Sequence, residues 1–282
     1  MNRIDKTLTE RLASNKKILS PYITAGDPSP ELTVPLMHKL VEAGADILEI
    51  GIPFSDPMAE GPVIQAAMER ALIHNVDCDV VFAMVEKFRQ RDKHTPIVLM
   101  GYLNPIEQYG YKEFGLRARE AGVDGTIIVD LPPEESELIA PIWNAHGLYA
   151  IYLCSPTTSD ERMVMINSYA KGYLYYVSLK GVTGSSDFNE KKVQYLYEYR
   201  KSQTKLPLMV GFGIKTEAMA AEVSQFADGV IIGAALVGRI FEAYNSIGGD
   251  PLEAGSTFIH DMRLAMDKPK FIPKVDKNGN KL

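Results

Sequence analysis

The sequence predicts an α/β fold, a (β/α)8 TIM barrel with an extra N-terminal helix and an extra C-terminal helix. Three observations predict it. Short apolar runs of strand length alternate with longer helical segments, there are eight such runs, and each run is apolar almost throughout. This repetition is typical of parallel strands joined by crossover helices, and unbroken apolar runs indicate strands that are buried on both faces. Eight units favour a closed barrel over an open sheet.

The predicted strands cover residues 18–23, 46–50, 97–102, 125–130, 149–154, 173–178, 208–211 and 229–232. Helical segments between them include residues 31–43, 80–91, 134–146 and 217–225. Residues 3–13 predict a helix before the first strand, and residues 251–266 predict one after the last unit. No low-complexity linker divides the chain, so residues 1–268 are expected to form one domain, followed by a polar, basic tail at residues 269–282.

Length and charge agree with this prediction. The chain has 282 residues, of which 46% are hydrophobic, and one barrel of this type commonly fills about 250 residues. Lys and Arg number 30 against 36 Asp and Glu, which gives a net charge of −6. Such a mildly acidic chain has no electrostatic basis for binding nucleic acid or an anionic membrane.

Cysteine usage and the first residues predict a cytoplasmic protein. The chain has two cysteines, Cys78 and Cys154, which make no disulfide framework and fit a reducing compartment. The polar first residues lack the apolar core of a signal peptide, and no run of about 18 apolar residues predicts a transmembrane helix.

Two acidic side chains are candidates for acid–base chemistry, because barrel active sites lie at the C-terminal ends of the strands. Glu49 lies near the end of the second predicted strand, where partial desolvation raises the pKa of a carboxyl toward the range useful for proton transfer. A structural glutamate paired to a neighbour is the alternative. Glu60, in the next loop, is either a second catalytic carboxylate or a helix-start acid favoured by the helix dipole. For Asp130 we expect a structural role in holding its own loop.

Three late segments predict a phosphate site. Residues 180–184 (KGVTG) follow the sixth strand, residues 211–213 (GFG) end the seventh, and residues 232–235 (IGAA) end the eighth and open a helix. Glycines after strands seven and eight are the usual phosphate site of barrels, where backbone N–H groups and a helix N-terminus attract a dianion. A dinucleotide fingerprint is the rival interpretation, but residue 216 is Thr instead of the third glycine and the motif lies late in the chain.

Other chemistries find less support. None of the five histidines falls at the C-terminal end of a predicted strand, which argues against a histidine base and a metal site. Cys154 ends the fifth strand without an evident histidine partner and is expected to be a buried, inert thiol. Lys180 leaves a Schiff-base aldolase open as an alternative. Aromatic side chains near the strand ends suggest a substrate with a flat apolar part, with barrel packing as the alternative; they are Tyr22, Tyr102, Tyr173, Tyr175 and Phe212.

Five segments resemble the signature motifs of tryptophan synthase α subunits. They are PYITAGDP at 21–28, LEIGIPFSDPMAEGP at 48–62, GYLNP at 101–105, VSLKGVTG at 177–184 and VGFGIKT at 210–216. Their order and spacing are those of the family, and the resemblance extends from the first helix to about Ala265. It implies a barrel that cleaves indole-3-glycerol phosphate by retro-aldol chemistry to indole and glyceraldehyde 3-phosphate, in L-tryptophan biosynthesis, with no cofactor and no metal in this chain.

The resemblance also implies roles for single residues. Glu49 matches the family's catalytic glutamate, which protonates C3 of the indole and handles the glycerol hydroxyl proton. Glu60 falls where the family usually has an aspartate that accepts the indole N–H. Thr183 matches the loop residue that bonds this acid, and Tyr175 matches a residue near the glycerol part. The pocket wall is matched by Tyr22, Tyr102 and Phe212, and the phosphate cradle by Gly184, Gly213, Gly233 and Ala234.

Two positions depart from the family's pattern. Glu60 reaches one methylene further than the usual aspartate, and a misplacement of about 1 Å can cost on the order of 10²-fold in rate. Ala234 stands where serine is common, which removes a hydroxyl and keeps the backbone N–H. The main hypothesis is an active lyase within a complex. The alternatives are a catalytically impaired barrel that allosterically activates its partner, and a free-standing lyase that releases indole.

The implied partner is a β subunit that carries pyridoxal phosphate, in an assembly of two α and two β chains through which indole passes. The loop at residues 53–60 and the turn at residues 131–133 lie on the active-site face of the predicted barrel, so they are expected to form the contact. The interface residues implied in this way are Pro53, Phe54, Asp56, Asn104, Leu131 and Pro132.

Overall fold

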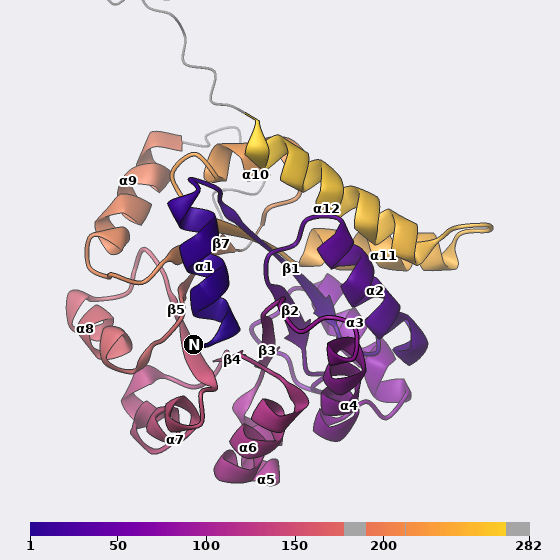
Figure 1. The fold of residues 1–282 in the computed structure, drawn as a ribbon, viewed down its shortest axis with the longest axis horizontal. Coiled ribbons are helices and arrows are strands. Elements are labelled where there is room, and N and C mark those ends of the chain that lie inside the picture. Colours follow the sequence, from indigo (N-terminus) through magenta and orange to yellow (C-terminus); the bar gives the residue numbers. More distant parts are fainter. Residues whose placement is uncertain (178–189, 212, 269–282) are drawn as a thin grey trace, which may run out of the picture.

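Eight parallel strands form a closed barrel in the computed structural model, and helices surround it (Figure 1). The structure describes residues 1–177, 190–211 and 213–268. Each strand pairs with the next, and β8 closes the ring against β1. The prediction of a (β/α)8 barrel is confirmed. The strands are β1 (Ile18–Thr24), β2 (Leu48–Gly51), β3 (Ile97–Gly101), β4 (Gly125–Ile128), β5 (Tyr149–Cys154), β6 (Leu174–Val177), β7 (Leu208–Gly211) and β8 (Gly229–Ile232).

The helices cover the outside of the barrel, and the predicted extra helices are α1 (Arg3–Ala13) and α12 (Pro251–Asp267). Figure 1 shows α12 alongside α11, and α12 also contacts α2 and α10. The other helices are α2 (Pro30–Glu42), α3 (Pro62–Ile73), α4 (Cys78–Arg89), α5 (Leu103–Tyr109), α6 (Tyr111–Ala121), the 3-10 helix η1 (Pro133–Leu138), α7 (Ala140–Ala145), α8 (Asp160–Tyr169), α9 (Glu190–Lys201), α10 (Glu217–Val223) and α11 (Ala234–Asn245).

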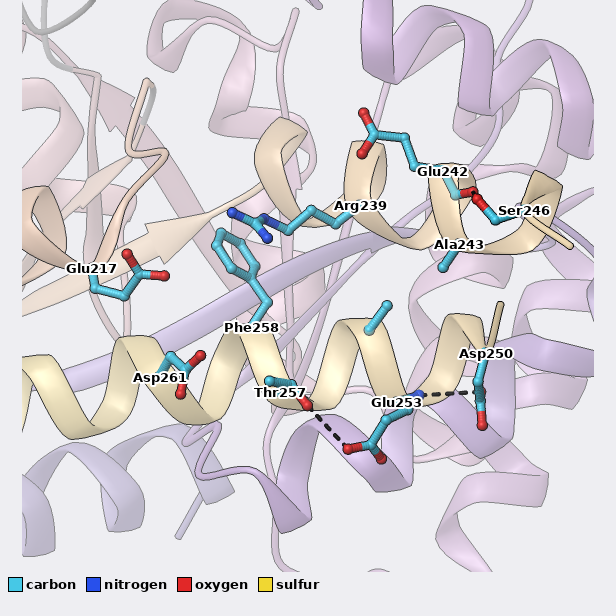
Figure 2. A pocket seen from close by; sticks show the side chains of 11 residues that line it. Glu217, Arg239, Glu242, Ala243, Ser246, Asp250, Glu253, Thr257, Phe258 and Asp261 are labelled. Carbon is cyan, nitrogen blue, oxygen red and sulfur yellow. Dashed lines mark hydrogen bonds between the residues drawn. The ribbon is translucent and has the colours of Figure 1, made fainter. Parts of the chain in front are cut away.

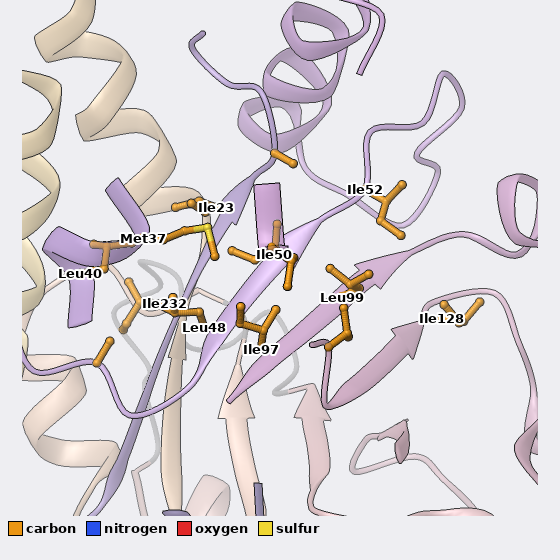
Figure 3. Close-up of a cluster of buried hydrophobic side chains, with 14 of the residues drawn as sticks. Ile23, Met37, Leu40, Leu48, Ile50, Ile52, Ile97, Leu99, Ile128 and Ile232 are labelled. Atoms are coloured by element: carbon orange, nitrogen blue, oxygen red, sulfur yellow. The ribbon is translucent and has the colours of Figure 1, made fainter. Parts of the chain in front are cut away.

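Side chains along each strand alternate between the barrel interior and the helix layer. Leu48 and Ile50 of β2 face the helix layer, where they belong to the same buried cluster as Met37 of α2 (Figure 3). The interior holds a separate apolar cluster that includes Tyr22 of β1. Because Glu49 lies between Leu48 and Ile50, its side chain points into the barrel.

Helix α1 closes the N-terminal ends of the strands. Ile4 and Leu8 pack into the interior cluster. The side chain of Asn2, just before this helix, donates to the main-chain oxygens of Asp124 and Gly147, at 2.9 Å each. These two residues precede β4 and β5, so the start of the chain is fixed to the base of the barrel.

Asp124 is the centre of an ionic cluster at this end. Its carboxylate is fully buried and pairs with Arg3 at 2.9 Å, Arg89 at 3.0 Å and Arg119 at 3.5 Å. The same carboxylate accepts the N–H of Ile97, the first residue of β3, at 3.0 Å. The Asp124 cluster therefore joins α1, α4, α6 and β3 at the start of β4.

Two predicted strands were longer than the observed ones, and in each the overpredicted end carries an aspartate. Residues 46–50 were predicted as a strand, but Asp46 accepts the N–H of Leu19 at 2.9 Å and pairs with Arg263 at 3.3 Å, so β2 begins only at Leu48. Residues 125–130 were predicted as a strand, but β4 ends at Ile128. The remaining predicted strands, as far as they are described, match the observed bounds within one residue.

The predicted helix at residues 134–146 is two shorter helices. A 3-10 helix ends at Leu138, and α7 begins at Ala140 with Pro141 in its first turn. Proline lacks the N–H that a helix interior requires, so a helix that ran through Pro141 would lose a backbone hydrogen bond. The prediction of one continuous helix was wrong for this reason.

We expect Asp124→Asn to lower the free energy of unfolding by about 2–4 kcal/mol, because three arginines would then surround a neutral side chain. Chemical denaturation measures the change. The matched control is Glu86→Gln, which removes a surface pair with Arg117 at 2.7 Å; such pairs contribute about 0–1 kcal/mol. Equal effects of the two substitutions would contradict the role given to the Asp124 cluster.

Candidate functional site

A cavity of about 580 Å³ opens at the C-terminal ends of the strands. This volume lies within the usual range of small-molecule sites, and the position is where barrel enzymes hold their substrates. Strands β1, β2, β3, β6 and β8 and the loops after β2, β7 and β8 contribute to its wall. The lining residues that matter below are Tyr22, Glu49, Glu60, Met100, Tyr175, Gly213, Ile231, Gly233 and Ala234.

Glu49 lines this cavity from β2, and its side chain is 0% exposed. The hydroxyls of Tyr173 and Ser20 both donate to its Oε1, at 2.9 and 3.2 Å. Its Oε2 is buried and has no hydrogen-bond partner among the described residues. Burial raises the pKa of Glu49 to about 7, although the two hydroxyls act in the opposite direction. A carboxyl with this pKa can both give and take a proton near neutrality.

Glu60 lines the same cavity from the loop between β2 and α3. Burial raises the pKa of its carboxyl to about 6. Its main-chain oxygen accepts the side-chain N–H of Gln65 at 2.9 Å, which fixes the loop to the first turn of α3. Glu60 thus precedes a helix, as one interpretation of the sequence held, and its carboxyl nevertheless lines the cavity.

Tyr102 holds this loop from the other side. Its hydroxyl accepts the N–H of Ala59 at 3.0 Å, and its ring stacks on Phe54 with 5.2 Å between centroids. Tyr102 was expected in the pocket wall, but it is not one of the residues that line the cavity. Tyr102 therefore helps to fix the position of Glu60 by holding the backbone of the preceding residue, Ala59.

Tyr22 and Tyr175 form an aromatic wall, and each ring requires a glycine on the next strand. A Cβ on Gly51 would lie 2.1 Å from the hydroxyl oxygen of Tyr22, and a Cβ on Gly211 would lie 2.2 Å from that of Tyr175. Both distances are far below contact. The glycines that end β2 and β7 therefore make room for this wall. For Gly211 this is a packing role, whereas the sequence placed it within a segment predicted to bind phosphate.

Gly213, Gly233 and Ala234 lie together at the wall formed by the loops after β7 and β8. Helix α11 begins at Ala234 with Gly233 as its N-cap residue. The first N–H groups of a helix lack partners within the helix and favour an anion. The structure brings these three residues to one cavity, while their part in phosphate binding stays a prediction. Thr183, Gly184 and Phe212 lie outside the described residues, as does Lys180.

Asp130 and Cys154 have structural surroundings. The carboxylate of Asp130 accepts the N–H of Leu103, the first residue of α5, at 2.7 Å. It therefore holds the neighbouring loop, whereas the sequence predicted that it holds its own. Cys154 is buried, and burial raises the pKa of its thiol to about 12, as expected for an inert cysteine.

The six residues predicted to contact a partner differ in exposure. Asp56 and Asn104 are exposed, and Phe54 and Pro132 are half-buried. Pro53 and Leu131 are buried within this chain, so a partner could reach them only at their edges. Their part in an interface stays a prediction.

Ser20 was not among the residues predicted for the site, and the contact of Tyr173 with Glu49 was not predicted either. Ser20 carried a weak signal, because it is a small polar residue within the apolar run of β1. Tyr173 was identified only as one of several aromatics. Its hydroxyl meets a carboxylate 124 positions earlier in the chain, which no local pattern reports.

A second cavity lies between α11 and α12 in the outer helix layer (Figure 2). Three of its charged side chains, those of Asp250, Glu253 and Arg239, have structural contacts. Asp250 caps α12 by accepting the N–H of Glu253 at 3.2 Å, and the carboxylate of Glu253 accepts the hydroxyl of Thr257 at 3.0 Å. Arg239 lies over the ring of Phe258 at 4.4 Å. The strand-end residues do not line this cavity, so it does not compete with the first as an active site.

The described ranges contain no group of three His, Cys, Asp or Glu side chains that could hold a metal ion. None of the helices in these ranges combines the length and apolar character that crossing a membrane requires.

Comparisons with known proteins agree with one another. The family described as "Tryptophan synthase alpha chain" matches residues 8–253. The tryptophan synthase alpha chain of Legionella pneumophila (strain Lens) is 65% identical over 267 residues, which cover 95% of this chain and 98% of that protein. The corresponding chain of Herminiimonas arsenicoxydans is 51% identical, over 95% of this chain and 100% of that protein. The crystal structure of the subunit from Legionella pneumophila str. Paris matches with a TM-score of 0.90 and 62% identity, over 95% of this chain and 99% of that one.

The raised pKa of Glu49 predicts a stability that depends on pH. Between its ordinary pKa of 4.5 and about 7, the folded chain binds a proton at Glu49 that the unfolded chain has released. The free energy of unfolding therefore falls as pH rises through this window. We expect wild type to lose about 2–3 kcal/mol relative to Glu49→Gln between pH 5 and pH 8.

Chemical denaturation at several pH values measures this difference. The exposed Glu120→Gln serves as the control. If the free energies of unfolding of wild type and Glu49→Gln differed by the same amount from pH 5 to pH 8, the pKa of Glu49 would be the same in the folded and the unfolded chain, and the prediction would be wrong.

Proposed function

The chain belongs to the family of tryptophan synthase alpha chains and cleaves indole-3-glycerol phosphate to indole and glyceraldehyde 3-phosphate, and we propose that Glu49 and Glu60 carry this reaction. The observation that carries the proposal is that a fully buried carboxyl, Glu49, and a half-buried one, Glu60, both with raised pKa values, line one cavity, whose wall also contains Gly213 and the N-terminus of α11. Two acidic groups and a candidate anion site therefore share one small-molecule cavity.

Glu49 is proposed to move both protons of the retro-aldol step. In its neutral form it donates a proton to C3 of the indole, which leaves an iminium at the ring nitrogen. The resulting carboxylate then takes the proton of the glycerol hydroxyl next to the scissile bond. The C–C bond breaks, its electron pair restores the indole, and the hydroxyl carbon becomes the aldehyde. Glu49 ends protonated, as it began, and a pKa of about 7 suits both transfers.

Glu60 is proposed to accept the indole N–H and to stabilise the positive charge that develops on the ring. Its carboxyl lies in the cavity, and Tyr102 and Gln65 fix the loop that carries it. A low-dielectric site strengthens the attraction between a carboxylate and a developing cation. Glu60 is one methylene longer than the usual aspartate, which had suggested a catalytically impaired barrel as an alternative. The position of Glu60 in the cavity favours an active enzyme instead.

The substrate phosphate is proposed to bind at Gly213, Gly233 and Ala234, together with Gly184 outside the described residues. Backbone N–H groups at the start of α11 would supply the hydrogen bonds. Ala234 offers its N–H without the hydroxyl that is common at this position in the family. Tyr22 and Tyr175 would contact the indole and glycerol parts along the aromatic wall.

The family implies a β-subunit partner. We propose an assembly of two α and two β chains, in which pyridoxal phosphate is bound by the β subunit and indole passes between the sites. Asp56 and Asn104 are exposed near the cavity-side loops, which supports a contact there. The proposed compartment is the cytoplasm, in agreement with two free, buried cysteines.

Release of indole from indole-3-glycerol phosphate by the purified chain tests the proposal directly. We expect slow turnover that rises sharply when the β subunit is added. Glu49→Gln should lower kcat by at least about 10³-fold, because it removes the group that moves both protons. Asp130→Asn is a matched control on the same face, with a carboxylate that serves only a loop. Near-normal turnover in Glu49→Gln would refute the assignment.

Glu60→Asp tests whether the glutamate works where relatives have aspartate. The loop is fixed around the longer side chain, so we expect the shortened carboxylate to lose contact and kcat to fall about 10-fold to 100-fold. Binding to the β subunit should persist, as gel filtration of the mixture would show. A large gain in kcat would instead support the catalytically impaired alternative.

A further inference from the structure

The two oxygens of the Glu49 carboxyl have different surroundings. Oε1 accepts hydrogen bonds from Tyr173 Oη at 2.9 Å and Ser20 Oγ at 3.2 Å. Oε2 is equally buried but has no hydrogen-bond partner within the part of the chain that the structure describes. A buried carboxyl oxygen without a partner costs free energy, so its persistence beside the cavity points to a use.

Ser20 has no evident packing role that requires a hydroxyl. It is 0% exposed on β1, between Ile18 and Tyr22, which both belong to the interior cluster. Strand alternation therefore directs Ser20 to the interior as well. A hydroxyl in such surroundings is unfavourable unless it is hydrogen-bonded, and alanine would fill nearly the same space. The hydroxyl of Ser20 finds its partner in Glu49, on the neighbouring strand.

We infer that Ser20 is a positioning residue for the cleavage reaction: together with Tyr173 it holds Oε1 of Glu49, so that Oε2 is the oxygen that gives and takes the proton. This inference rests on the proposed role of Glu49. It adds that the hydroxyl of Ser20 acts beside that of Tyr173, and that Oε1 is held while Oε2 reacts.

The arrangement serves both protonation states of Glu49. In the neutral acid the proton sits on Oε2, and Oε1 is a carbonyl oxygen that still accepts from both hydroxyls. In the carboxylate the same two bonds persist. The proton can leave Oε2 for the indole carbon and return to Oε2 from the glycerol hydroxyl without a rotation of the side chain. Two donors on one oxygen thus keep the reacting oxygen in place through the cycle.

The groups that face Glu49 determine the direction of the pH effect. Ser20 and Tyr22 approach from β1, Tyr173 and Tyr175 approach from the β6 side, and Glu60 faces the same cavity. The tyrosine hydroxyls stay neutral, because burial raises the pKa of each of these three phenols well above its usual value. Donation by Ser20 stabilises the carboxylate form of Glu49 and so lowers its pKa.

Ser20→Ala is the decisive variant, with two measurements. The first is the titration of the Glu49 carboxyl in the ligand-free protein, by ¹³C NMR with Glu49→Gln to assign the signal. We expect an upward shift of about one pH unit when the hydroxyl is removed. The second is the pH profile of indole release with the β subunit present. Because the reaction starts from neutral Glu49, its basic limb should move upward by the same amount, with kcat lower by about tenfold and KM nearly unchanged.

Two further variants separate positioning from packing. Ser20→Thr keeps the hydroxyl and should restore the titration and most of kcat. Thr126→Val removes a buried hydroxyl from β4, whose contact is the main-chain oxygen of Tyr149 at 3.5 Å, and should leave both measurements unchanged.

Unchanged titration of Glu49 in Ser20→Ala would overturn the inference and leave Tyr173 as the sole partner. If the titration shifts but the wild-type chain with its β subunit releases no indole, the Ser20 contact would be supported and the reaction proposed for Glu49 would be refuted. The titration thus distinguishes failure of the inference from failure of the proposed function.

Discussion

A carboxyl buried inside an apolar barrel is the constraint on which the active end of this protein depends. Glu49 is wholly enclosed, and burial alone would keep it neutral. Two hydroxyls on Oε1 partly offset that effect, and the pKa of the group lies at about 7. The neighbouring aromatic wall has a matching requirement, because Tyr22 fits only beside a glycine at the end of β2. Strand β2 thus supplies both the proposed catalytic carboxyl, at Glu49, and the glycine that makes room for the aromatic wall, at Gly51.

Stability and function occupy opposite ends of the barrel. At the N-terminal ends of the strands, Asp124 gathers three arginines and a backbone N–H, and Asp46 pairs with Arg11 and Arg263. These charges are paired with opposite charges. At the C-terminal ends, the pKa values of Glu49 and Glu60 are raised by burial, and Oε2 of Glu49 lacks a partner among the described residues. This carboxyl oxygen lies beside the cavity, where a substrate could be its partner.

The loop between β2 and α3 connects the substrate cavity to the surface proposed for the partner. Tyr102 holds the backbone at Ala59 and stacks on Phe54, while Glu60 lines the cavity from the same loop. A partner that contacts exposed Asp56 would therefore act on a segment that carries a proposed catalytic carboxyl. Tyr102 holds the backbone before Glu60, and Gln65 holds the main-chain oxygen of Glu60 itself. A displacement of this loop by the partner would therefore reach the Glu60 carboxyl, which is how the proposed coupling between subunits could act.

The sequence by itself determined the eight strands and their order, and it identified two candidate carboxyls for the active end. Apolar periodicity and the strand-end rule depend only on neighbours in the chain, so they can be seen without a structure. Tertiary structure alone decided the partners of Glu49, because Ser20 and Tyr173 lie 29 and 124 positions away. It also turned Tyr102 toward the loop after β2. These outcomes depend on which side chains meet across the barrel, and closure of the sheet determines that.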